Sequence, residues 1–565
     1  MKQTRPWLFV LLCAVGVSVC SAVLLAVPWP SPKAVAALVL DVLLPGLLLY
    51  RVIFRRGSDH TIVEAALIAL GLGYALSEVV TLGLHYVPGT LTRRLSLGVY
   101  DALLILLLGA NLLWPYASRV RKLQRREGLT VVALLVVAAL FRLVNLSYSE
   151  FQGDEVAVVH KAAAAIQGRD DVLFLHRKGP AEILLVLLPY AQGMALNEWG
   201  ARLPFALANV LAVLALYQIA KRGLGERAAA WVGLLASLNG FFVAFGRIVQ
   251  YQSLVLLFGA LGVLMALDYA ATHERRYIWL SALFLAVGMW AHSDAAFAVI
   301  PAAWLILRGE LSTERLPKRT WRDLVKAVGG PVLLGMVLLA AFYGPYVTSA
   351  TFAQTAGYLS LRMGAEPPYN NLGHLLEIGT VYNAVYYLAF VGAVALWVLL
   401  RRSAEATPLR WALPLALVVM LVQAAWTGDS WTFQGQDWLG LLFVAWFVAA
   451  ICAPEGSGLD RPLLLWFGVP FIIFMFWFDD PRTHVYAFFP GALLLVGAQL
   501  ASWQEALKGK GWLVPVASLP WLGMAVAYLV IVLVSHQPEY RRTYPDHRIR
   551  AFWVPYGDEF PEQGL

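Results

Sequence analysis

Charged residues are scarce in this chain. Of its 565 residues only 14% are Asp, Glu, Lys or Arg, whereas 60% are hydrophobic and the mean hydropathy is +0.67. A soluble protein of this size lacks the polar residues needed to cover so much apolar surface. The composition therefore excludes a soluble globular protein and indicates one that lies in a membrane.

Several familiar motifs are also missing. The three cysteines, Cys13, Cys20 and Cys452, lie in or beside apolar stretches and show neither disulfide nor zinc spacing. The chain has no Gly-rich P-loop and no GxGxxG motif, which argues against ATP or dinucleotide chemistry. It has no HxxxH or HExxH spacing, so no sequence motif establishes a metal site, although a divalent metal stays possible.

Long apolar runs of roughly 17–22 residues recur from end to end. The short alternating segments of a membrane β-barrel are absent. We therefore predict an all-α integral membrane protein, a polytopic helical bundle with about 17 spans. The predicted spans are 7–27, 34–52, 61–83, 97–116, 129–147, 204–221, 227–245, 249–270, 277–291, 294–308, 328–349, 380–400, 410–427, 436–452, 462–478, 485–500 and 512–535.

The basic residues gather in alternate short loops, such as Arg51–Arg56, Arg119–Arg126 and Arg308–Lys326. Basic loops mark the cytoplasmic side of a membrane protein. The net charge of +8 therefore reflects topology and does not indicate a nucleic-acid partner. We predict a multi-pass plasma-membrane protein with a cytoplasmic N-terminus and an outer C-terminus. Arg93-Arg94, on the outer side, is the one mild exception.

The polar residues with chemical potential collect in the other set of loops, on the outer face. Asp154 and Glu155 stand out, because two adjacent acids at a membrane exit are not needed to end a helix. A carboxylate beside apolar surface is a stronger base than one in water, which suits proton abstraction from a hydroxyl. The alternative is a solvated acidic loop.

The segment HRKGP, residues 176–180, places His176, Arg177 and Lys178 before a Gly-Pro turn. Such cations bind phosphate or diphosphate through charge-assisted hydrogen bonds, or else they only snorkel at the interface. The apolar stretch that follows, Ala181–Gln192, is predicted to lie in the interface, since a crossing there would invert the charge bias of every later loop.

Two arginines sit at outer span boundaries. Arg202 lies in ARLP, where anchoring to lipid headgroups is an equal alternative to a role in the site. Arg247 is followed by Gln250 and Tyr251, which make an unusually polar start to a span. This combination predicts the lining of a pocket.

Two further outer turns carry titratable groups. AHSDA, residues 291–295, contains His292 and Asp294, and DDPRTHVY, residues 479–486, contains Arg482, His484 and Tyr486. His with Asp can ligate a divalent metal or relay a proton.

The chain divides into three predicted parts: an accessory region of four spans over 1–128, a catalytic core over 129–535, and a short outer tail over 536–565. The long outer loop 350–379 is a candidate lid.

The order of these motifs resembles that of the C-type (GT-C) membrane glycosyltransferases, in the clan of protein O-mannosyltransferases and the aminoarabinose transferase of lipid A. The matching elements are GDE (153–155), Lys178-Gly179-Pro180, ARLPFALANVLAVLALYQIAKRGLGERAA (201–229), Gly246-Arg247 and Arg482–Gly491. The resemblance covers roughly 129–500. Gly179 replaces a proline, and Gln252 stands where many members have Asp.

The resemblance implies a GT-C-like core and a polyprenyl-phosphate-linked sugar as donor. Asp154 would be the catalytic base with Glu155 supporting it, and Lys178, Arg247, Arg482 and Arg202 would hold the donor phosphate. The acceptor would be a lipid, glycan or protein at the outer face, and membrane lipids would surround the bundle.

Two alternatives remain. A lipid or glycan transporter or flippase predicts charges at mid-membrane depth and repeated halves, whereas in this sequence the charges cluster at span ends and there is no clear internal repeat. A transferase that modifies lipid phosphate groups would need little base catalysis, so Asp154→Asn would then be mild.

Overall fold

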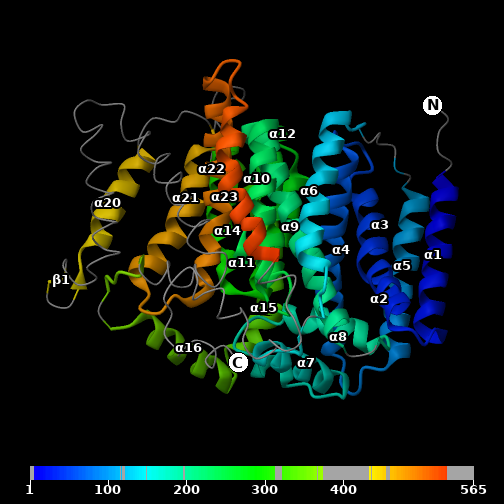
Figure 1. Cartoon of the computed structure of the whole chain (residues 1–565). Helices are drawn as coiled ribbons and strands as arrows, with labels where there is room; N and C mark the ends of the chain where they lie inside the picture. Colours follow the sequence, from blue (N-terminus) through cyan, green and yellow to red (C-terminus); the bar gives the residue numbers. More distant parts are fainter. Residues whose placement is uncertain are drawn as a thin grey trace.

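The computed structural model describes residues 6–114, 116, 121–147, 149–194, 197–311, 321–365, 367–372, 432–433, 436–452 and 458–530. Within these ranges the chain is almost entirely helical. Two strands of two residues each, β1 (Thr432–Phe433) and β2 (Gln436–Asp437), pair antiparallel. The helices run side by side along most of the molecule, as Figure 1 shows.

Nine of the described helices are long and apolar enough to cross a membrane. This confirms the all-α polytopic fold, while the total of about 17 spans stays a prediction. Spans 380–400 and 410–427, and residues 531–535 of the last span, lie outside the described residues; the described residues of each other predicted span fall mainly on one helix or on consecutive helices. The elements of the first half are α1 (Pro6–Ala26), α2 (Pro30–Leu38), the π-helix η1 (Val39–Leu43), α3 (Leu44–Ile53), α4 (Ile62–His85), α5 (Arg93–Leu113), α6 (Arg125–Leu143), α7 (Gly153–Ile166), η2 (Val172–Leu175), α8 (Ala181–Ala191), α9 (Glu198–Leu224) and α10 (Glu226–Leu238).

The second half continues the bundle. Its elements are α11 (Gly240–Phe245), α12 (Gln252–Thr272), α13 (Arg275–Ala291), η3 (Ser293–Ala295), α14 (Ala296–Leu311), α15 (Trp321–Tyr346), α16 (Ala350–Met363), α20 (Leu439–Cys452), α21 (Asp460–Ile472), η4 (Ile473–Trp477), η5 (Arg482–Phe488), α22 (Phe489–Ala506) and α23 (Leu513–Tyr528).

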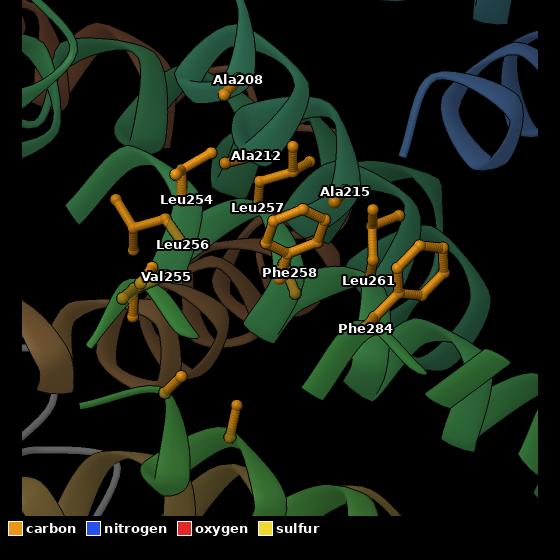
Figure 2. Close-up of a cluster of buried hydrophobic side chains, with 14 of the residues drawn as sticks. Ala208, Ala212, Ala215, Leu254, Val255, Leu256, Leu257, Phe258, Leu261 and Phe284 are labelled. Atoms are coloured by element: carbon orange, nitrogen blue, oxygen red, sulfur yellow. The ribbon is translucent and has the colours of Figure 1, made fainter. Parts of the chain in front are cut away.

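The centre of the bundle is formed where α9, α12 and α13 pack together. Alanines on α9 face large side chains of α12, such as Leu257 and Phe258, while Phe284 of α13 covers Leu261 (Figure 2). Lipid provides no hydrophobic force that drives membrane helices together, so their association depends on close van der Waals packing. Small residues allow the helices to approach closely enough for that packing. The facing alanines are Ala208, Ala212 and Ala215.

The N-terminal helices have a smaller core of their own, formed by α1, α2, η1, α3 and α5. Helix α4 instead joins the main core, where it packs against α8, α9 and α13. Asp41 of η1 accepts a hydrogen bond of 2.7 Å from Gln192, which ties this region to the end of α8. The boundary at 128 therefore separates segments that are firmly packed on each other.

Helix α8 confirms the expected short helix after the Gly-Pro turn. Its 11 residues span about 16 Å, too little to cross a hydrocarbon core of about 30 Å. Helices α7, α8 and α16 lie across one end of the bundle, at the bottom of Figure 1. The residues expected to form the site are close to these three helices.

Candidate active site

The two adjacent acids begin helix α7. Gln152 is its N-cap, and its backbone N–H donates to the Glu155 carboxylate at 3.1 Å, as part of a capping box. Acids in the first turn also favour the helix dipole. Successive helical residues point in different directions, so Glu155 is buried while Asp154 is 62% exposed.

Glu155 is an anchor inside the protein. Both of its carboxylate oxygens accept hydrogen bonds of 2.8 Å from the Arg202 guanidinium, and the backbone N–H of Val249 donates to it at 2.8 Å. Arg202 also donates to the carbonyls of Leu146 and Ser149. The pair thus connects α7, α9 and the segment before α12, and Arg202 is fully buried.

Asp154 faces the surface of the site. Its Oδ2 lies 3.4 Å from Lys178 Nζ and accepts a hydrogen bond of 2.8 Å from the Gln250 amide. The sequence-based expectation of apolar surroundings for this carboxylate is wrong, since the side chain is mostly exposed at the start of α7. Polar neighbours set its environment instead.

Lys178 is held between two carboxylates, those of Asp154 and of Glu182, whose oxygen lies 3.7 Å from Nζ. Burial lowers the pKa of the Lys178 ammonium, but Glu182 and Asp154 raise that pKa above its usual value. Nζ also lies 5.0 Å from the centre of the Tyr251 ring. Lys178 is therefore a permanent cation at physiological pH.

The turn after Lys178 requires glycine. A Cβ on Gly179 would lie 1.7 Å from the Trp290 carbonyl oxygen at the end of α13. This close approach of two backbones explains why glycine occupies a position where the resembling enzymes have proline.

Arg247 lies deeper than its predicted role suggests. It is fully buried, and its guanidinium donates to the carbonyls of Phe141, Val144 and Asn145 at 2.8–3.0 Å. These carbonyls end α6 and begin the loop that leads to α7. Arg247 thus holds the chain that carries the acids.

A second polar group lies next to Tyr251. The Tyr251 ring stacks on His292 at 4.2 Å between centroids. Asp294 joins two histidines, with 3.1 Å to His292 Nδ1 and 2.8 Å to His484 Nδ1. The ligand atoms of these three residues lie within 4.8 Å of one another. Two imidazoles and a carboxylate suit a divalent transition metal, so they are the residues that could hold one.

The other predicted residues surround this centre. Arg482 is 63% exposed and bonds to Asp480 at 2.7 Å, while Tyr486 is buried, 6.3 Å from the Tyr251 ring. His176 bonds to Glu182, and burial lowers the pKa of its imidazole. Arg177 lies over the Tyr358 ring of α16, at 5.7 Å.

Two residues of this region were missed from the sequence. Glu182 is fully buried and contacts His176 and Lys178. In the sequence it lies within the apolar stretch that forms α8, and it was not predicted as a site residue. Arg362, at the end of α16, donates to the Asp480 carbonyl and links the candidate lid to the turn before η5. A single acid opening an apolar helix was the available signal for Glu182. The part of the lid over 373–379 lies outside the described residues.

The fold defines a polytopic helical membrane protein. Residues 188–361 match the sequence model of the dolichyl-phosphate-mannose-protein mannosyltransferase family. This match confirms the resemblance that the motifs predicted, over the segment with Arg202, Arg247, Tyr251, His292 and Asp294. No curated protein sequence matches the chain.

Two kinds of solved structure resemble the chain. ArnT from Cupriavidus metallidurans bound to undecaprenyl phosphate is 17% identical with a TM-score of 0.38, and the match covers 73% of this chain and 68% of ArnT. The oligosaccharyltransferase of Archaeoglobus fulgidus in the apo form is 13% identical with a TM-score of 0.38, covering 76% of this chain and 60% of that one.

Proposed function

We propose that the protein is a membrane glycosyltransferase that transfers a sugar from a polyprenyl-phosphate-linked donor to an acceptor hydroxyl at the outer face of the plasma membrane. The family match over 188–361 supports the class of reaction. The observation that supports the site most directly is the Asp154–Lys178 pair, 3.4 Å apart at the end of the bundle that carries α7, α8 and α16.

In this reaction the acceptor oxygen forms a bond to the anomeric carbon as the bond from that carbon to the phosphate breaks. Asp154 takes the hydroxyl proton, and the lipid phosphate leaves with the bonding electrons. Lys178 stabilises the charge that develops on this phosphate. A donor phosphate that binds Lys178 would also compete with Asp154 for the ammonium, so donor binding would release the base.

The remaining residues have supporting roles in this proposal. Glu155, Arg202 and Arg247 hold the loop between α6 and α7 in place, because their polar groups bond to each other and to backbone carbonyls. Of the arginines predicted for the site, Arg482 and Arg177 have exposed side chains and are available to meet the donor phosphate or the acceptor. A metal bound by His292, Asp294 and His484 would supply a Lewis acid beside the site.

The transporter alternative gains one observation. Asp41 and Glu78 are buried within predicted spans, so the expectation that charges cluster at span ends is wrong for these two residues, whereas the buried Arg142 lies in the last turn of α6. Asp41 and Glu78 belong to the N-terminal helices, away from the residues gathered around Lys178, and Arg142 bonds to Asn209 at 2.7 Å. These buried charges support transport less strongly than the residues gathered around Lys178 support sugar transfer.

The test is sugar transfer from radiolabelled polyprenyl-phosphate sugars in liposomes. We expect Asp154→Asn and Lys178→Ala each to lower the turnover rate by roughly 100-fold or more. Asp171→Asn is the matched control, because this acid lies in the same predicted outer loop, is 60% exposed and, among the residues that the structure describes, forms an ion pair with Arg169 alone. Full activity of Asp154→Asn would reject the base and favour a phosphate acceptor. Lipid movement without transfer would favour a flippase.

A further inference from the structure

A cavity of about 940 Å³ lies between the ends of α3, α9, α12 and α13. Its lining comes from the segment 53–60 after α3, from α9 near its C-terminus, and from the segment 272–277 between α12 and α13. Five of the lining residues are arginines and two, Asp59 and Glu274, are acids. The arginines are Arg55, Arg56, Arg222, Arg275 and Arg276.

The cavity is at the opposite membrane face from the candidate active site. Helix α12 starts beside Tyr251 in the site and ends at Thr272 in the cavity wall. Its 21 residues span about 31 Å, the thickness of a hydrocarbon core. Helix α9 likewise carries Arg202 near its start and Arg222 in its last turn. The basic loops predict that this second face is cytoplasmic.

One wall of the cavity is fixed by a buried ion-pair network. Arg222 contacts Glu64 at 3.1 Å and also bonds to Asp268. Both carboxylates are nearly fully buried, whereas the Arg222 side chain is 26% exposed. The charge of Arg222 is therefore compensated, and its guanidinium is held at the cavity edge by two partners.

Two further lining residues, His60 and Arg276, add no uncompensated charge to the cavity. His60 is buried, with Nδ1 at 2.9 Å from the Tyr50 hydroxyl and Nε2 at 3.1 Å from the Tyr277 hydroxyl. Burial and the neighbouring Arg222 lower the pKa of His60 to about 4, so it is neutral. Arg276 pairs with Glu274 and lies over the Phe54 ring, 4.6 Å from its centroid.

The remaining three arginines give the cavity its surplus of positive charge. Arg55, Arg56 and Arg275 form no ion pair with any residue that the structure describes. Arg55 lies over the Trp114 ring at 5.2 Å. Of the two acids in the lining, Glu274 pairs with Arg276, so Asp59 alone offsets these three cations. An anion entering the cavity therefore meets several guanidinium groups at once.

We propose that this cavity binds the phosphate of an anionic phospholipid headgroup. A guanidinium group can donate two parallel hydrogen bonds to the oxygens of one phosphate. The cavity lies at the ends of the helices, which is the depth of the lipid headgroups. Basic pockets between membrane helices on the cytoplasmic side suit the anionic lipids of that leaflet. The volume is sufficient for a glycerophosphate headgroup. This site is independent of the proposed transfer reaction, which takes place at the other face.

The test compares two double variants of the full-length protein in a zwitterionic detergent. Arg56→Ala/Arg275→Ala removes two exposed cations of the cavity. Arg125→Ala/Arg126→Ala removes two exposed arginines that start α6 on the same face but do not line the cavity. The backbone N–H of Arg121, four residues before Arg125, donates a hydrogen bond of 3.0 Å to the His60 carbonyl. Arg125 and Arg126 are therefore near the cavity without lining it.

The shift in the midpoint of thermal unfolding is titrated with phosphatidylglycerol, with phosphatidylcholine and with inorganic diphosphate. We expect stabilisation by phosphatidylglycerol alone, and roughly 10- to 30-fold weaker binding in the cavity variant only. An equal loss in both variants would reject a defined site. Stabilisation by diphosphate that matches the lipid would reject the lipid and assign the cavity to a soluble phosphate. Unchanged lipid binding in the cavity variant would reject the proposal altogether.

Discussion

Arg202 donates a hydrogen bond of 2.8 Å to each oxygen of the Glu155 carboxylate, and neither side chain is exposed. The acid next to it in the sequence, Asp154, points the other way and meets Lys178. One pair of adjacent carboxylates therefore performs two separate tasks. Glu155 fixes the loop to the bundle, and Asp154 is left to face a substrate.

Replacement of the buried acid tests this division. In Glu155→Gln the Arg202 guanidinium keeps its charge without a carboxylate, which costs about 3 kcal/mol when one partner of a buried pair is removed. We expect a lower midpoint of thermal unfolding in detergent. Asp154→Asn, at a site 62% exposed, should leave the midpoint almost unchanged. Equal stability of the two variants would contradict the assignment of Glu155 as an anchor.

The turn that carries Lys178 depends on a close backbone contact. In Gly179→Ala the new Cβ would overlap the Trp290 carbonyl, so the turn must move and Lys178 with it. We expect transfer activity to fall by roughly tenfold or more, because displacements of about 1 Å cost this much in an active site. Gly357→Ala on α16, where a Cβ meets nothing within 4 Å, is the control. Equal activity of the two variants would show that the turn tolerates a side chain.

The fold was accessible from the sequence because each span is long, apolar and bounded by charge. The short helix α8 was accessible too, since a crossing there conflicts with the basic loops. The partners of the charged side chains were not. The positive charges of Arg202 and Arg247 suggested phosphate binding, but their contacts depend on backbone carbonyls at and after the end of α6, which the packing of α6 on α9 and α11 brings near. Glu182 was hidden for the same reason: an acid in an apolar helix acquires meaning only when His176 and Lys178 are seen beside it.

The trio of His292, Asp294 and His484 predicts binding of one divalent transition metal ion. Two turns far apart in the sequence contribute ligand atoms within 4.8 Å of one another. We expect Zn²⁺ to raise the midpoint of thermal unfolding of the wild type, and to do so much less in His292→Ala and in His484→Ala. Metal content measured on the purified protein gives a second readout. His160→Ala, which removes an exposed histidine of α7, is the control. If all four proteins respond alike to Zn²⁺, the trio is a hydrogen-bonded network and holds no metal.

The buried His60 predicts a loss of stability in acid. Its pKa of about 4 in the folded protein lies below the ordinary value near 6.5, because burial and Arg222 disfavour the charged imidazole. Between these two values the unfolded chain binds the proton and the folded chain does not, so stability falls as the pH drops from about 6.5 toward 4. From pH 7 to pH 5 the loss is about 2 kcal/mol. We expect His60→Gln, which cannot take up a proton, to show a flatter dependence of the unfolding midpoint on pH. His160→Gln, which removes an exposed imidazole, should behave like the wild type. An unfolding midpoint that falls by the same amount between pH 7 and pH 5 in the wild type and in His60→Gln would assign the acid sensitivity to other groups.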